Sequence, residues 1–453
     1  MVHSSDRPVV KAAVTSSVTG HHPQLLRAIG FWALTASFIN VSIGGSIYVL
    51  QGTFAGTLGV AAPLVFLFGA LVFVPVTMCL AAAGSRIIAT GGPYIYVRAA
   101  FGPLPSFLTG SVFWISNFAG SAGLAAALMD QAAQVVPSIS QPLPRAAVVG
   151  TIYSLLCMLN ARGIRTGAMA IILLAAVKLL PLALLTVLGS FYIHAANYHG
   201  PATITWSAIG NGMVLVMFCY SGMEIALSVS GEIHDPSRVV PRATLFAIAA
   251  VVLLAVGLQI VAQGVLGTRL ANNPAPLAAL AEAMLPGSYG AIVVAASIAM
   301  FGILQGELVG SSRLLYALAR DRYLPSFLCH VTVRRRVPLF ALITHAAIVA
   351  TVATFGTFKW LALVSGGAIS IVYIGCCAAA WRLQKQDTRD SGRPFVLPGG
   401  PWIPLLTCCA LVLILLTLER SEWKAIGYAL LVVLALYGVT RSSHFGRAAI
   451  PRR

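Results

Sequence analysis

Long apolar runs separated by short polar connections dominate this chain of 453 residues. A membrane-spanning helix needs about 20 predominantly apolar residues, and about twelve runs meet or approach that length. They lie at 28–53, 60–85, 104–135, 146–160, 168–193, 207–230, 243–267, 288–318, 337–357, 361–382, 402–418 and 424–440. The pattern therefore predicts an all-α polytopic membrane protein. The stretch 91–102 is too short to span and opens with Gly-Gly-Pro, which predicts a short interfacial helix.

Two of the runs are interrupted by residues that favour departure from the helix. The first contains NVSIGGSIY at 40–48, and the sixth contains FCYSGME at 218–224. In hydrocarbon, such a break persists only where the freed backbone groups face protein or a water-filled cavity. Broken helices at corresponding positions of two five-helix halves are typical of inverted-repeat transporters. The alternative for each break is a kinked helix that serves only packing.

The breaks divide the chain into predicted units. The divisions are a cytosolic N-terminal tail (1–26), a first inverted repeat (27–195), a second inverted repeat (207–384), two additional helices (385–440) and a cytosolic C-terminal tail (441–453). No sequence identity aligns the two repeats, so the repeat is inferred from the positions of the breaks.

Composition and charge agree with a membrane protein. The chain is 58% hydrophobic and 9% charged, whereas soluble proteins are roughly one quarter charged. Of its 29 Lys and Arg residues, 23 fall on the side that holds both termini and five on the opposite side. This asymmetry predicts a multi-pass protein of the plasma or inner membrane with both termini cytosolic. The basic residues are scattered among short loops, so the net charge of +17 indicates contact with anionic lipid rather than nucleic acid.

Several functional classes lack the residues that they need. The eight cysteines include two adjacent pairs inside apolar runs, without metal-ligand spacing, and are interpreted as packing residues. The histidines lie mainly in tails and loops. An enzyme would need a nucleophile–base pair or clustered metal ligands at membrane depth. We therefore expect no catalytic residues, no metal site and no cofactor.

Three ionisable residues lie inside the spans, where each is a candidate functional group. Glu224 follows the second break, and because burial opposes the charged form of an ionisable group it is a candidate proton carrier; the alternative is a hydrogen-bonded helix brace. Lys178 is too deep to reach the membrane surface easily. It is either a functional group or one half of a structural ion pair. Glu307 is a second acidic residue inside a span, where it can pair with Lys178 or Arg313.

Four motifs in order resemble a known family, the amino acid–polyamine–organocation permeases. They are IGGSIY, GGPYIYVRAAFG, YSGME…GEIHDPSRVVPRA and LLYALARDRYLPSF, which together cover about residues 28–328. The resemblance implies the leucine-transporter-like fold, with broken helices 1 and 6 and the substrate at the interface of two inverted repeats. One departure is Ser46, which stands where the family usually has glycine.

The resemblance also implies a substrate site at the breaks. A helix N-terminus binds anions, so the N–H groups of Gly45 and Ser46 would hold a substrate carboxylate, and carbonyls would hold its ammonium. The predicted substrate-binding residues are Ser42, Ile43, Gly44, Gly45, Ser46, Asn117, Ser121, Phe218, Ser221, Gly222 and Glu307. Phe218 aligns with a gating aromatic position of related antiporters, with core packing as the alternative. For Asn117 and Ser121 the alternative is helix-to-helix hydrogen bonding.

Several proton-coupled members of the family carry a lysine in the fifth helix, and its ammonium stands where sodium-coupled members bind their ion. This resemblance assigns proton coupling to Lys178. Glu224 aligns with a glutamate that has a proton role in antiporter relatives. Glu232 and Arg238 can pair with cytosolic charges such as Arg86 or Arg98, and these four residues are assigned to a cytosolic gate.

The sequence thus predicts a secondary transporter of amino acids or related amines, driven by protons or exchange. The alternative is a polyamine or organic-cation carrier in which Glu307 reads the substrate charge. The predicted partners are the small-molecule substrate, protons or an exchanged substrate, and the lipid bilayer.

Overall fold

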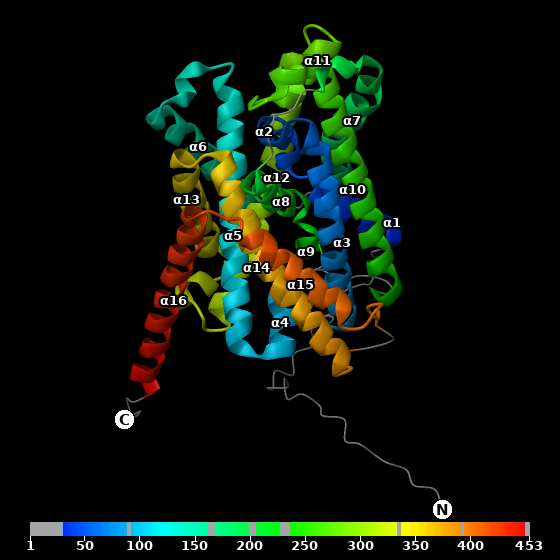
Figure 1. Ribbon diagram of the computed structural model, residues 1–453. Helices are drawn as coiled ribbons and strands as arrows, with labels where there is room; N and C mark the ends of the chain where they lie inside the picture. The colour runs from blue at the N-terminus through cyan, green and yellow to red at the C-terminus, as the bar shows by residue number, and fades with distance from the viewer. Residues whose placement is uncertain are drawn as a thin grey trace, which may run out of the picture.

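The computed structural model describes residues 30–448 except 88–91, 162–167, 199–204, 227–235, 333–336 and 391–393, and no strand occurs in these ranges. The helices form an elongated bundle (Figure 1). Their bounds are α1 Phe31–Ser42, α2 Leu50–Leu58, α3 Ala62–Arg86, α4 Pro93–Phe101, α5 Pro103–Ala133, α6 Pro142–Ala161, α7 Ala168–Gly189, α8 Trp206–Tyr220, α9 Met223–Ala226, α10 Pro236–Leu266, α11 Pro276–Met284, α12 Tyr289–Arg320, α13 Leu339–Phe355, α14 Phe358–Lys385, α15 Trp402–Leu415 and α16 Arg420–Ala448.

The apolar runs of the sequence correspond to these helices. Within the described ranges, seven helices are long and apolar enough to cross a membrane, and five further apolar helices are shorter. The shorter ones include α1 and α8, which end at the two predicted breaks. The all-α polytopic fold and both helix interruptions are therefore confirmed. The fourth span is longer than predicted, because α6 starts at Pro142, a residue that suits a first helical turn.

Two short helices lie between the spans. α4 matches the predicted interfacial helix and begins at Pro93 after Gly92, whose φ of +59° favours glycine. α11 was not predicted, because its nine residues are too few to span. It is tied to the start of α12 by Glu282, which accepts hydrogen bonds from the N–H groups of Gly287 (2.9 Å) and Tyr289 (2.8 Å). These two bonds lower the pKa of Glu282.

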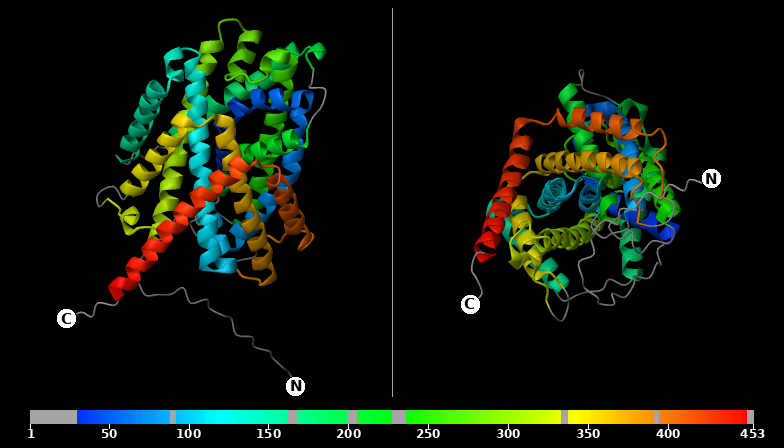
Figure 2. Two further views of the ribbon diagram at one scale, coloured as in Figure 1. Left: turned by 60° about the vertical axis from the view of Figure 1, so that its left-hand side comes forward. Right: turned by 90° about the horizontal axis from the view of Figure 1, so that it is seen from below.

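The buried centre of the bundle is formed by α5 and α14, which pack side by side, with α8 against α14 (Figure 2). Small residues permit this close approach. Ser116 of α5 and Ser365 of α14 exchange hydrogen bonds, in which each hydroxyl donates to the other residue's carbonyl at 3.0 and 2.8 Å. A Cβ at Gly366 would lie 2.3 Å from the carbonyl oxygen of Val214 in α8.

The Gly366 contact gives a first prediction. Gly366→Ala is expected to destabilise the protein by about 2 kcal/mol, because the added methyl group must push the α8 backbone away from α14. Thermal unfolding in detergent measures the effect. The control is Gly438→Ala on α16, where an added Cβ has no neighbour within 4 Å and stability should not fall. Equal stability of the two variants would contradict the close packing of α8 on α14.

Candidate functional site

The first break lies between α1 and α2. α1 ends at Ser42, the N–H of Gly44 folds back onto the carbonyl of Ser42 at 2.8 Å, and a 3-10 turn occupies Gly45–Tyr48. Among the described residues, the N–H groups of Gly45 and Ser46 have no backbone acceptor. Two unpaired donors at the start of a helical turn can bind an anion. The Ser42 carbonyl retains a second lone pair for a cation.

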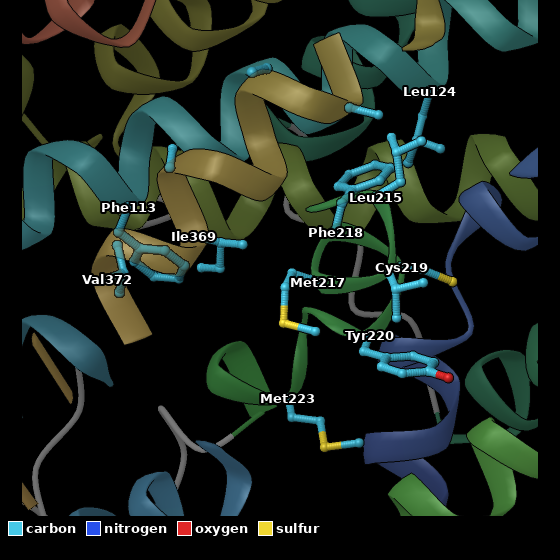
Figure 3. Close-up of a cluster of buried hydrophobic side chains, with 14 of the residues drawn as sticks. Phe113, Leu124, Leu215, Met217, Phe218, Cys219, Tyr220, Met223, Ile369 and Val372 are labelled. Atoms are coloured by element: carbon cyan, nitrogen blue, oxygen red, sulfur yellow. The ribbon is translucent and has the colours of Figure 1, made fainter. Parts of the chain in front are cut away.

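The second break lies between α8 and α9. α8 ends at Tyr220, Ser221 is extended with ψ of 162°, and Gly222 has φ of +119°. The Ser221 hydroxyl donates to the Phe218 carbonyl at 2.8 Å. In Figure 3 the helix unwinds between Tyr220 and Met223, while Tyr220 points toward the blue N-terminal segment. The last carbonyls of α8 therefore lie beside non-helical backbone. Helix-end carbonyls without intrahelical donors can bind a cation.

The two breaks touch each other. A Cβ on Gly222 would lie 2.8 Å from Cγ1 and 3.2 Å from the carbonyl oxygen of Val41, in the last turn of α1. A Cβ on Gly45 would lie 3.0 Å from Leu124 of α5 and 3.0 Å from Met300 of α12. The two interrupted backbones thus touch, and Gly45 of the first break lies between α5 and α12.

Glu224 is held by hydrogen bonds at both carboxylate oxygens. Oε1 accepts the N–H of Gly222 at 3.0 Å, and Oε2 accepts the hydroxyl of Tyr373 at 3.1 Å. Glu224 therefore stabilises the break and connects it to α14. This is the geometry of the helix brace, and a proton role remains a prediction.

Lys178 connects α7 to the end of α1. Its side chain is buried, and Nζ donates a hydrogen bond to the Asn40 carbonyl. Its own carbonyl accepts the hydroxyl of Tyr48 at 2.9 Å. No acidic side chain pairs with Lys178 in the part of the chain that the structure describes. A carbonyl rather than a carboxylate holds this ammonium, which lies next to the first break.

Glu307 lies on the face of α12 that approaches the first break. Ile303, one turn earlier, lies 3.7 Å from a Cβ placed on Gly45. The carboxylate atom Oε2 is buried without a hydrogen-bond partner, and neither Lys178 nor Arg313 forms an ion pair with Glu307 among the described residues. A buried acceptor without a hydrogen-bond partner can receive a donor or a cation from a ligand.

The side chains predicted on α5 differ in their surroundings. Ser121 is buried and its hydroxyl has no partner, and Asn117 is half-buried without a side-chain hydrogen bond, in the described part of the chain. Helix-to-helix hydrogen bonding was the alternative for these two side chains, and neither side chain forms such a bond in the described part of the chain. Phe218 is buried, with its ring 6.3 Å from the Phe358 ring and one edge 3.1 Å from a Cβ placed on Gly120 of α5. These are packing contacts, and its gate role remains a prediction.

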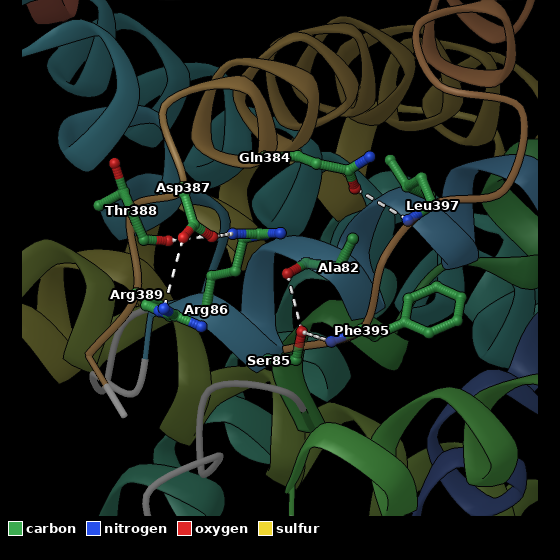
Figure 4. A network of polar contacts seen from close by, with 9 residues as sticks. All are labelled: Ala82, Ser85, Arg86, Gln384, Asp387, Thr388, Arg389, Phe395 and Leu397. Atoms are coloured by element: carbon green, nitrogen blue, oxygen red, sulfur yellow. Dashed lines mark hydrogen bonds and ion pairs between the residues drawn. The ribbon is translucent and has the colours of Figure 1, made fainter. Parts of the chain in front are cut away.

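The residues predicted for the cytosolic gate have separate environments. Arg86 is buried at the end of α3 and contacts Asp387 (3.4 Å) and the carbonyl of Thr388 (3.3 Å), as Figure 4 shows. Arg98 pairs with Asp321 at 2.6 Å. Arg238 is exposed on α10, and Glu232 lies outside the described residues. The structure thus gives Arg86 and Arg98 acidic partners other than Glu232.

Sequence reasoning missed Asp321, on which several groups converge. Its carboxylate accepts hydrogen bonds from Tyr94, Arg98 and Arg320. Burial raises the pKa of Tyr94, and its hydrogen bond to Asp321 raises it further. Burial lowers the pKa of Arg98, but attraction to Asp321 together with the contributions of Tyr94 and Tyr323 leaves that pKa raised. Asp321 falls within the fourth motif, ARDRYLP, and that acidic residue between two arginines was the available signal.

Comparison with known proteins agrees with this geometry. The model of the family described as "Amino acid permease" matches residues 29–440. The chain belongs to the amino acid permease family. It is 25% identical to the branched-chain amino acid permease BcaP of Bacillus subtilis, over 93% of this chain and 95% of the relative. It is 23% identical to the serine/threonine exchanger SteT of the same organism, over 91% and 95% of the two chains.

A further relative, an uncharacterized transporter of Mycobacterium tuberculosis, is 28% identical over 92% of each chain. These proteins are transporters and not enzymes. This permease is therefore a multi-pass membrane protein and a transporter of amino acids.

Proposed function

We propose that this permease is a secondary active transporter that moves an amino acid or a related amine by alternating access, driven by protons or by exchange. The observation that carries the proposal is the contact between two interrupted helices, at Gly222 and Val41, beside the N–H groups of Gly45 and Ser46, which have no backbone acceptor among the described residues. Irregular backbone at membrane depth is stable only where it is buried in protein or lines a water-filled cavity. Two such segments side by side make a backbone-lined substrate site.

In this site the substrate carboxylate binds the N–H groups of Gly45 and Ser46, where the helix dipole also favours negative charge. The substrate ammonium binds carbonyls at the ends of α1 and α8, from Ser42, Phe218 and Ser221. The Ser121 hydroxyl, which is buried and has no partner in the part of the chain that the structure describes, is available for a further hydrogen bond. Recognition by backbone groups leaves the substrate side chain to be selected by the surrounding helices.

In this proposal, Lys178 couples substrate movement to protons. Its ammonium binds the Asn40 carbonyl at the end of α1, so a change in its charge alters a contact one turn from the substrate site. Glu224 is the second proton-responsive group. A change in its protonation alters its hydrogen bond to Gly222, and with it the second break that Glu224 stabilises. The name of one relative, a serine/threonine exchanger, supports exchange as the drive.

The architecture proposed for transport has two inverted repeats, residues 27–195 and 207–384, each with a broken first helix, followed by two additional helices in 385–440. Both termini face the cytosol, and the protein resides in the plasma or inner membrane, because 23 of the 29 basic residues fall on one side. Rocking of the repeats exposes the site alternately to the two sides. Arg86, Arg98, Arg238 and Glu232 belong to the cytosolic closure.

A polyamine or organic-cation carrier is the second candidate, favoured by one observation. Glu307 Oε2 is buried without a partner, and no basic side chain pairs with Glu307 in the described ranges. A buried carboxylate is costly unless a cation compensates it. A substrate that carries an extra positive charge can supply that compensation.

One uptake experiment tests both candidates. Proteoliposomes with an inward proton gradient are given neutral, acidic and basic amino acids and putrescine, for the wild type and Glu307→Gln. We expect neutral amino acid uptake to change by less than about threefold in the variant and cationic substrate uptake to fall at least about tenfold, because one buried charge pair contributes roughly 1.5–3 kcal/mol. Glu282→Gln on α11 is the control. Uptake of no amino acid would overturn the proposed function, and uptake of cations alone would replace it with the second candidate.

A further inference from the structure

Two exposed cations at the cytosolic end of α14 each lie over an aromatic ring. The guanidinium of Arg382 lies 5.0 Å from the centroid of the Phe101 ring of α4, and Nζ of Lys385 lies 5.4 Å from that of Trp381. Both basic side chains are exposed, and Trp381 is 41% exposed. We name these four residues the aromatic–basic cluster. The stacked rings hold the cations in place without neutralising them.

The nearby carboxylates are engaged elsewhere. Asp387, two residues after Lys385, contacts Arg86 (3.4 Å) and Arg389 (3.5 Å). Asp321 contacts Arg98 and Arg320. Neither Arg382 nor Lys385 forms an ion pair in the described ranges of the chain. The aromatic–basic cluster therefore presents two uncompensated positive charges.

The surroundings of the cluster are those of a membrane surface. α14 is one of the seven long apolar helices, and the cluster occupies its last turns, beside the interfacial helix α4 at the lower end of the molecule (Figure 1). Leu104, three residues after Phe101, is 57% exposed at the start of α5. Tryptophan with basic side chains at the end of a span is typical of the headgroup level.

We propose that the aromatic–basic cluster binds the phosphate headgroup of an anionic phospholipid. Arg382 and Lys385 contact the phosphate, and Trp381 and Leu104 contact the upper part of an acyl chain. A bound lipid then fixes the end of α14 against α4, and α14 is the helix that packs on α5 and α8 at the site. The exposed apolar side chains beside the cations favour a lipid over a free anion.

The test is lipid binding to the purified permease, measured by native mass spectrometry during titration with phosphatidylglycerol or chain-matched phosphatidylcholine. The wild type is expected to retain phosphatidylglycerol at least about tenfold more tightly than phosphatidylcholine. The double variant Arg382→Gln/Lys385→Gln should lose about 25-fold in phosphatidylglycerol affinity, since each basic residue near an anionic surface contributes roughly fivefold. Unchanged thermal unfolding shows that the double variant is folded.

The matched control is Arg322→Gln/Arg389→Gln, which removes two exposed cations from the same end of the molecule that do not stack on rings. Its affinity for phosphatidylglycerol should change by less than about threefold. Equal losses in the two double variants would show a general charge effect and overturn the specific site. Displacement of the lipid by inorganic phosphate at millimolar concentration would identify a free-anion site instead and also overturn the proposal.

Discussion

Gly222→Ala is expected to reduce substrate uptake at least about 100-fold in proteoliposomes. The φ of Gly222 is +119°, where a residue with a Cβ is strained by roughly 1–3 kcal/mol. The added methyl group would also lie 2.8 Å from Val41 Cγ1 and 3.2 Å from its carbonyl oxygen. Relief of that contact separates α1 from α9, so the carbonyls and N–H groups that bind substrate no longer converge.

The comparison variant is Gly150→Ala on α6, where an added Cβ has no neighbour within 4 Å. It should retain uptake close to that of the wild type. Size-exclusion chromatography and thermal unfolding of Gly222→Ala separate a folded, inactive protein from an unfolded one. A Gly222→Ala protein with at least about one third of wild-type uptake would show that close contact of the breaks is not needed for transport.

Lys178→Met is expected to abolish the response of uptake to a proton gradient and to reduce the maximal rate at least about tenfold. The substitution retains most of the side-chain volume but removes the ammonium that donates to the Asn40 carbonyl. That carbonyl then lacks its charged donor at membrane depth, where an unsatisfied backbone group costs several kcal/mol. The end of α1 is thereby destabilised next to Ser42 and Gly44.

Lys359→Met is the matched control, because Lys359 is an exposed residue in the first turn of α14. Uptake is measured at several external pH values with and without a gradient, for both variants and the wild type. If Lys178→Met keeps the gradient response of the wild type, the coupling role of Lys178 is wrong. If the wild type itself shows no response, exchange is the drive and Lys178 is structural.

The interruptions of the first and sixth spans followed from their residues, since Gly44, Gly45 and Gly222 disfavour a continuous helix wherever the chain places them. The contact partners of Glu224 did not follow. Its bond to Tyr373 joins residues 149 positions apart, and apolar periodicity carries no information about which distant hydroxyl faces a carboxylate. Asp387 and Asp321, the partners of Arg86 and Arg98, were missed for the same reason.

The sequence by itself determined what depends on local composition: the approximate limits of the apolar helices, the two breaks, the short helix that begins at Pro93 and the family motifs. A span is specified by about 20 successive apolar residues, so its signal is complete within one segment. Only the tertiary structure decided that Gly222 lies against Val41, that Glu307 has no ion-pair partner among the described residues, and that Arg382 and Lys385 lie over rings. These features arise when helices distant in sequence pack together, and packing depends on shape complementarity between side chains that no single segment contains.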